Sequence, residues 1–222
     1  KIEVKSMRVL KFAKIDILLC KSYMWILLFP VLVLAIVILE PDMNSLYGTI
    51  YCLFGGLVLS SLPFTLHDPR QTGGFTRLLP ARQGDNIKGH FLFSFLFLLL
   101  FLILSLPAAG LGGLFKGETA ALLSPALYMV LFSFTLLFAA LQNLLFCILH
   151  TNSQQAQQLI RMAPPFLFFF GGVSLLQRFP DIFTVLDILF TPAGSCLCLL
   201  AGLVLFVLAA ELGAFFVSRQ EG

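Results

Sequence analysis

Residues 91–110 read FLFSFLFLLLFLILSLPAAG, which is twenty consecutive residues without a charged side chain. An α-helix needs about 20 apolar residues to cross the hydrocarbon core of a bilayer, which is about 30 Å thick. In lipid, such a helix satisfies its own backbone polar groups. The stretch therefore predicts a transmembrane helix.

The composition of the whole chain agrees with this prediction. Its 222 residues are 59% hydrophobic and 11% charged, and their mean hydropathy is +0.98. Soluble domains are about 45–50% apolar and about 25% charged, and disordered chains are less hydrophobic still. Both classes are excluded. The net charge of +3 gives little electrostatic support for a nucleic-acid partner.

Six apolar segments in all are long enough to be considered as spans. They are Tyr23–Leu39, Leu46–Leu66, Phe91–Gly110, Ala120–Leu149, Met162–Leu176 and Thr191–Ala210, the last continuing past Glu211 to Val217. We predict an all-α polytopic membrane protein with six transmembrane helices, in which residues 1–222 form a single transmembrane domain.

Basic residues are concentrated on one side of the predicted spans. Twelve of the fourteen Lys and Arg residues precede the first span, follow the sixth, or lie between the second and third or the fourth and fifth. The two exceptions are Lys116 and Arg178. Because cytoplasmic loops carry an excess of Lys and Arg, both termini are predicted to be cytoplasmic. This orientation requires an even number of spans.

Residues 1–22 are too polar to cross the bilayer, yet they show helical periodicity. The pattern predicts an amphipathic helix on the inner membrane surface, with its cations available to anionic lipid. The predicted apolar stripe is Leu10, Ala13, Ile17 and Cys20, and the cations largely opposite it are Arg8, Lys11 and Lys14.

Residues 177–192 are also neither a span nor a simple loop. From Asp181 to Phe190, ten mostly apolar residues are interrupted by Asp187 and followed by Thr191–Pro192. Ten residues are too few to cross a bilayer. The segment is predicted to dip into the outer leaflet as a re-entrant segment before the sixth span begins.

Residues 67–90, HDPRQTGGFTRLLPARQGDNIKGH, form the largest polar island of the chain. Phe75, Leu78 and Leu79 are apolar residues within this basic, predicted cytoplasmic loop. Two interpretations stay open from composition: a solvated loop that packs on lipid headgroups, or a docking element for a cytoplasmic partner.

Several short motifs carry a family resemblance. Lys14–Leu19 (KIDILL) matches a pattern of the form "ikkDlll", Asp68 stands twelve residues before Pro80 in a Leu-Pro step, and Gly89–Phe91 is in register with a Gly-Lys-Tyr motif. With these motifs the chain resembles the permease subunits of the type-2 ABC transporter superfamily, in the branch of compact six-helix bacterial exporters. Arg82 lies one position early, and His90 replaces the lysine, whose role Lys88 would have to supply.

The resemblance implies a role for each unusual segment. Residues 1–22 would be an elbow helix, residues 177–192 re-entrant helices, and residues 67–90 a coupling helix that seats in a groove of a cytoplasmic ATPase. The implied ATPase-coupling residues are Asp68, Phe75, Arg77, Leu78, Leu79, Pro80 and Arg82.

The resemblance also implies partners and a cellular location. Two ABC ATPase subunits and a second permease, identical or paralogous, would join this chain in a bacterial plasma membrane. ATP and Mg would be bound by the ATPase, since the chain contains no G-x-x-x-x-G-K-[ST] phosphate loop. The chain itself would then hold no cofactor and have no catalytic residue. The apolar spans favour an amphipathic or hydrophobic cargo, such as a peptide or lipid-like compound.

Three polar residues within the predicted spans are candidates for gating or substrate contact. They are Glu211, Gln142 and Asn143. An ionisable group inside a span is costly and is a functional hypothesis by default. The structural alternatives are an interfacial carboxylate that pairs with Arg219 or the elbow lysines, and amides that form interhelical hydrogen bonds.

The histidines and cysteines do not indicate a metal site or a disulfide framework. His67, His90 and His150 lie near predicted cytoplasmic helix ends, where capping accounts for them. The five cysteines are odd in number and lie mostly in apolar runs.

Two other classes of protein remain as alternatives. A polytopic membrane enzyme would need a nucleophile and a base, or two facing acids. A non-transporting scaffold or binding subunit would need neither. A neighbouring ATPase gene would separate the permease from both alternatives.

The predicted orientation can be tested by cysteine labelling in a background without native cysteines. Cysteines that replace Asp42, Lys116 or Asp181 are expected to react with an impermeant maleimide in intact cells. An Arg77→Cys variant is expected to react only after permeabilisation. Labelling of position 77 from outside would overturn the orientation.

Overall fold

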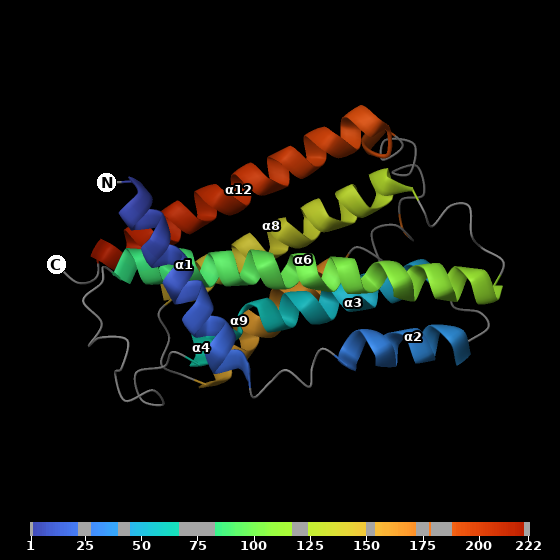
Figure 1. Cartoon of the computed structure of the whole chain (residues 1–222), viewed down its shortest axis with the longest axis horizontal. Helices are drawn as coiled ribbons and strands as arrows, with labels where there is room; N and C mark the ends of the chain where they lie inside the picture. The colour runs from blue at the N-terminus through green and yellow to red at the C-terminus, as the bar shows by residue number, and fades with distance from the viewer. Residues whose placement is uncertain are drawn as a thin grey trace.

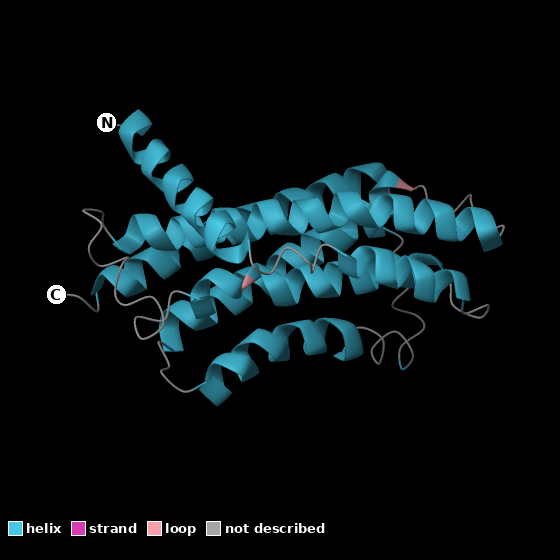
Figure 2. Cartoon of the chain, turned by 60° about the horizontal axis from the view of Figure 1, so that its bottom comes forward, coloured by secondary structure: helices cyan, strands magenta, loops and turns pink. Residues whose placement is uncertain are grey.

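The computed structural model describes residues 2–21, 28–39, 45–66, 83–116, 124–149, 154–171, 178 and 188–219. Within these ranges all regular secondary structure is helical, with no strand (Figure 2). Three of the helices are long and apolar enough to cross a membrane: Gly84–Pro107, Pro125–Leu149 and Pro192–Arg219. The prediction of an all-helical membrane protein is confirmed at this level.

The described elements follow one another in a simple order. They are α1 (Ile2–Leu19), α2 (Phe29–Leu39), α3 (Ser45–Ser60), α4 (Leu62–Leu66), α6 (Gln83–Lys116), α8 (Pro125–Leu149), α9 (Gln154–Phe166), the π-helix η2 (Leu167–Gly171) and α12 (Pro192–Arg219).

Figure 1 shows α3, α6, α8 and α12 running lengthwise through the molecule, while α1 crosses α6 at a steep angle. At this end of the bundle α6 begins, α8 and α12 end, and both chain termini lie (Figure 1). We call it the α1 end. The short helix α4 also lies there, so α4 and the first residues of α6 are at the same end (Figure 1).

The main core lies between α6, α8 and α12. It is built from large side chains such as Phe91, Leu98, Leu136 and Phe206.

The pairing of α8 with α12 is close because small residues meet there. A Cβ atom on Gly202 would lie 2.6 Å from Ser133 Oγ, and this hydroxyl donates a hydrogen bond of 2.6 Å to Cys198 O. Small residues at helix contacts allow such close approach within membranes.

Two of the predicted spans are interrupted. The second is divided at Ser61, where α3 ends and α4 begins. The fifth predicted span begins at Met162, but the helix that contains it, α9, already begins at Gln154 with two polar helical turns. This helix contains Pro164 and Pro165 and is followed directly by the π-helix η2. Proline removes a backbone donor and disturbs the preceding turn of the helix.

The residues of the predicted apolar stripe of the N-terminal helix lie in two different environments. Ala13 and Cys20 are buried, but Leu10 and Ile17 are exposed. The inward face of α1 instead includes Phe12 and Asp16. Gly89 permits the close approach of this face to α6, because a Cβ atom there would lie 2.5 Å from Phe12 Cβ and 3.2 Å from Ala13 N. The missing side chain lets α1 lie directly on α6.

The residues implied for the coupling helix and most of residues 177–192 lie outside the described residues. Residues 67–82 include all seven implied coupling positions: Asp68, Phe75, Arg77, Leu78, Leu79, Pro80 and Arg82.

The packing of α12 on α8 can be tested with matched glycine substitutions. Gly202→Ala is expected to destabilise the protein by about 1–3 kcal/mol, because the added methyl group overpacks a close contact. Gly110→Ala, in α6, adds a methyl group with nothing within 4 Å. It is expected to be neutral or to stabilise by up to about 1 kcal/mol through helix propensity. Thermal unfolding in detergent measures the stability of both variants. Equal changes in stability for Gly202→Ala and Gly110→Ala would contradict the close packing of α12 on α8.

Candidate functional site

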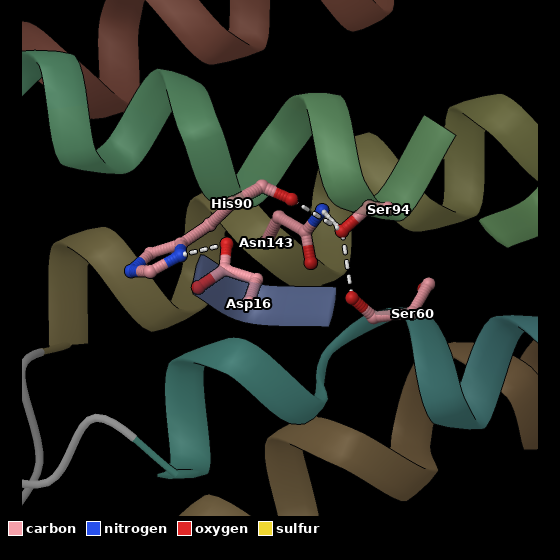
Figure 3. A network of polar contacts seen from close by, with 5 residues as sticks. All are labelled: Asp16, Ser60, His90, Ser94 and Asn143. Carbon is pink, nitrogen blue, oxygen red and sulfur yellow. Dashed lines mark hydrogen bonds and ion pairs between the residues drawn. The ribbon is translucent and has the colours of Figure 1, made fainter. Parts of the chain in front are cut away.

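A buried polar network lies at the α1 end and links four elements of the chain. Figure 3 shows its five residues: Asp16 from α1, Ser60 from α3, His90 and Ser94 from α6, and Asn143 from α8. All five are buried in the structure. Buried polar groups require hydrogen-bond partners, so a network of this kind fixes how the helices fit together.

The centre of the network is the contact between Asp16 and His90. Asp16 Oδ2 lies 2.7 Å from His90 Nδ1, and the two residues are 0% and 2% exposed. An ionised carboxylate can only accept, so Nδ1 then carries the proton of this hydrogen bond. The ring of Phe64, from α4, packs edge-on against the imidazole with 5.1 Å between ring centroids. The contact thus joins α1, α4 and α6.

Ser94 extends the network to α3 and α8. Its hydroxyl lies 2.6 Å from Ser60 O and 3.0 Å from His90 O, and it accepts a hydrogen bond of 3.0 Å from Asn143 Nδ2. The break after α3 makes Ser60 O accessible to Ser94. Phe64 N–H donates to Ser61 O, not to the carbonyl four residues back, and so leaves Ser60 O for the serine.

Gln142, next to Asn143 on α8, makes a parallel link to α9. Its amide Nε2 donates to Arg161 O at 2.8 Å and to Ser61 Oγ at 3.3 Å. In a regular helix the donor to Arg161 O would be the N–H of residue 165, which is a proline and has none. The helix interruptions in α3–α4 and α9 therefore expose the carbonyl groups that the polar side chains use.

Glu211 lies at the α1 end but forms a separate contact. It makes an ion pair with Lys88 of α6 and is itself exposed. The Arg219 guanidinium instead lies 4.8 Å from the centre of the Phe215 ring. Exposed ion pairs contribute about 0–1 kcal/mol, so this pair positions α12 on α6 only weakly.

The three polar residues that were candidates for gating or substrate contact lie in two different environments. Gln142 and Asn143 are fully buried and make interhelical hydrogen bonds within the polar layer. Glu211 lies on the outer surface of the bundle beside Lys88.

Of the five residues of the network, only Asn143 was a candidate from the sequence, and Asp16, Ser60, His90 and Ser94 were not recognised as site residues. The capping interpretation of His90 is wrong, because His90 is the eighth residue of α6 and contacts a carboxylate. Asp16 was noted only as part of a motif. The available signal was a single acid within the apolar run of residues 15–19, on a helix too polar to cross the membrane.

The chemistry open to this arrangement is limited by its geometry. A carboxylate that holds Nδ1 of a histidine resembles the orienting half of a hydrolase triad. The Ser94 hydroxyl, however, is directed to backbone carbonyl groups, away from the imidazole ring (Figure 3). Asp16, His90 and Ser94 therefore do not form a nucleophile–base set. No group of three His, Cys, Asp or Glu suited to a metal occurs among the residues that the structure describes.

The Cys20 thiol, next to the network, has a raised pKa. It lies one helical turn after Asp16, on the same buried face of α1. Burial, assisted by the negative charge of Asp16, raises the pKa of the Cys20 thiol to about 12. Cys20 is therefore protonated and unreactive as long as α1 stays on the bundle.

Comparisons of the chain with protein-family models, with curated proteins and with solved structures find no match. Function is therefore inferred from the residues and their arrangement.

A double-mutant cycle tests whether Asp16 and His90 act as a pair. Asp16→Leu or His90→Phe alone leaves a buried polar partner and is expected to cost about 3–5 kcal/mol of unfolding free energy. The double variant leaves no buried polar group without its partner. Its loss of unfolding free energy is expected to be much smaller than the summed losses of the two single variants. Lys14→Leu, at an exposed position of α1, combined with His90→Phe serves as the additive control. Additive effects for Asp16 and His90 would refute the pairing.

Proposed function

We propose that the chain is the membrane-spanning permease subunit of an ATP-driven ABC exporter. In this proposal six helices cross the membrane and both termini lie in the cytoplasm, so the α1 end is the cytoplasmic end. α1 is the elbow, and the coupling segment, predicted as residues 67–90, is limited to residues 67–82 because α6 begins at Gln83. This segment would seat in one of two separate ATPase subunits.

The observation that carries the proposal is the meeting of two motifs that are distant in the sequence. Lys14–Leu19 and Gly89–Phe91 carry the resemblance to permeases, and their members Asp16 and His90 are in contact. Gly89, the residue before His90, supplies the space in which α1 lies on α6. If the two motifs served only to insert the chain into a membrane, there would be no reason for them to be in contact in the folded protein.

The α1 end offers a physical route for coupling. The proposed coupling segment is continuous with α4 on one side and with α6 on the other. Phe64 of α4 and His90 of α6 pack together, and Asp16 ties both to α1. A displacement of the segment by an ATPase would then move α1, α4 and α6 together, because breaking the buried contact is costly.

The hydrogen bonds beyond His90 carry this displacement further into the bundle. Ser94 connects α6 to Ser60 of α3 and to Asn143 of α8. Gln142 of α8 connects in turn to the α9 backbone at Arg161. In the proposed cycle, ATP-driven closure shifts this connected layer and alternates access at the interface with a second permease. Gln142, Asn143 and Glu211 would then be positioning residues.

The exposed surfaces of the helices support an amphipathic or hydrophobic cargo. The outward face of α12 presents a continuous apolar surface, including Leu200, Val204 and Leu208. Apolar surface of this kind suits contact with lipid tails or with a peptide or lipid-like compound that partitions into the bilayer.

Substitutions in the coupling segment test the proposal most sharply. Phe75→Ala with Leu79→Ala is expected to weaken association with the cognate ATPase at least 100-fold. Truncated apolar anchors at interfaces each cost roughly 2–4 kcal/mol, and about 1.4 kcal/mol corresponds to a tenfold change. Co-purification and ATP hydrolysis in reconstituted membranes are the measurements.

A matched control removes two polar side chains from the same segment, Gln71→Ala with Thr76→Ala. This variant is expected to bind the ATPase within about threefold of the wild type, since polar contacts at the rim of an interface contribute little. If the Phe75 and Leu79 variant also bound normally, the loop would be a solvated connector, and the scaffold interpretation would be favoured.

A further inference from the structure

The outward face of α1 carries a row of lysines. Lys11, Lys14 and Lys21 are all exposed, as is Leu18 between them. The intervals of three, four and three residues place the four side chains on one stripe of the helix, because residues three and four apart are neighbours on a helix surface. At 1.5 Å per residue this stripe is about 15 Å long. We call it the lysine stripe.

The lysine stripe has no compensating negative charge in the described structure. The nearby acid of the same helix, Asp16, faces inward, is fully buried and contacts His90. Among the described residues, none of the three lysines has an acidic partner within ion-pair distance. Over residues 11–21 the docking of α1 on α6 therefore separates charge, with the Asp16 carboxylate inside and the ammonium groups outside.

Apolar side chains accompany the lysines on the exposed surface. Leu10 and Ile17 are exposed beside the stripe, and Leu18 within it is 61% exposed. In water, exposed leucine and isoleucine residues between lysines would be unfavourable. At a membrane interface the same combination is favourable, because apolar groups reach the acyl boundary while cations meet the headgroups. The position of α1 across the end of helices long enough to span a bilayer places it at this level (Figure 1).

We propose that the lysine stripe is a selective binding surface for anionic phospholipid headgroups. Phosphate and other anionic groups of the adjacent leaflet would bind Lys11, Lys14 and Lys21, while Leu18 contacts the acyl chains. Because the same helix holds Asp16 against His90, bound headgroups also stabilise α1 on α6. This property does not depend on an ATPase, so it stands or falls separately from the proposed transport function.

Lipid-dependent fluorescence quenching tests the selectivity directly. A tryptophan at the centre of the stripe, Leu18→Trp in a Trp25→Phe background, is the reporter in the full chain reconstituted in vesicles. Brominated phosphatidylglycerol is expected to bind beside it roughly 10- to 100-fold more strongly than brominated phosphatidylcholine, since each lysine contributes about a fivefold preference before screening. The preference is expected to fall at high salt.

Two matched controls make the test specific. Leu200→Trp places the reporter on an exposed position of α12, away from the stripe, and is expected to show no headgroup preference. Replacing the three lysines by glutamine is expected to abolish the preference at position 18, whereas replacing them by arginine is expected to keep it. Equal quenching by the two lipids at position 18, an equal preference at position 200, or a preference that survives the glutamine substitutions would overturn the proposal.

Thermal stability provides a second readout that detects loss of structure. The wild type and the arginine variant are expected to unfold at a higher temperature in anionic than in zwitterionic nanodiscs. The glutamine variant is expected to match the wild type in zwitterionic nanodiscs and to gain nothing from anionic lipid. A glutamine variant that gained as much as the wild type would refute the link between the lysine stripe and the docking of α1.

Discussion

The contact between Asp16 and His90 is the interaction on which the arrangement of the α1 end depends. A carboxylate at 0% exposure is strongly destabilising unless a polar partner meets it. His90 is that partner, at 2.7 Å, and it belongs to the longest described helix of the chain. The pair therefore fixes the rotation of α1, which places Phe12 over Gly89 and turns the lysines outward.

The helix interruptions are part of the same construction. Breaks at Ser61 and at Pro164–Pro165 leave backbone carbonyl groups without their usual helical donors. Ser94 and Gln142 supply donors from neighbouring helices, to Ser60 O and Arg161 O. Interhelical hydrogen bonds in membranes contribute about 0.6–2 kcal/mol each. Several of them in one layer give the α1 end a defined packing that apolar contacts alone would not specify.

The long apolar helices were predictable from the sequence, whereas of the polar layer only the interhelical hydrogen bonds of Gln142 and Asn143 were anticipated. Hydrophobic length alone predicts α6, α8 and α12, because a span needs about 20 apolar residues whatever its neighbours are. The inward face of α1 depends on a partner 74 residues away, so periodicity did not show that Phe12 and Asp16 are buried while Leu10 and Ile17 are exposed. His90 was assigned to capping for the same reason. The resemblance marked Asp16 and His90 separately, but only the fold brings them together.

The most direct test of the docking of α1 is the pH dependence of Cys20 alkylation, resolved by peptide mass spectrometry in the reconstituted protein. With a pKa raised from 9.0 to about 12, the thiolate at pH 8 is roughly a thousandfold scarcer than in the unfolded chain. We predict that labelling of folded Cys20 stays slow and is still rising at pH 11, while the unfolded chain titrates near pH 9. Labelling of folded Cys20 that levels off near pH 9, at the rate of the unfolded chain, would show that α1 is not held on α6.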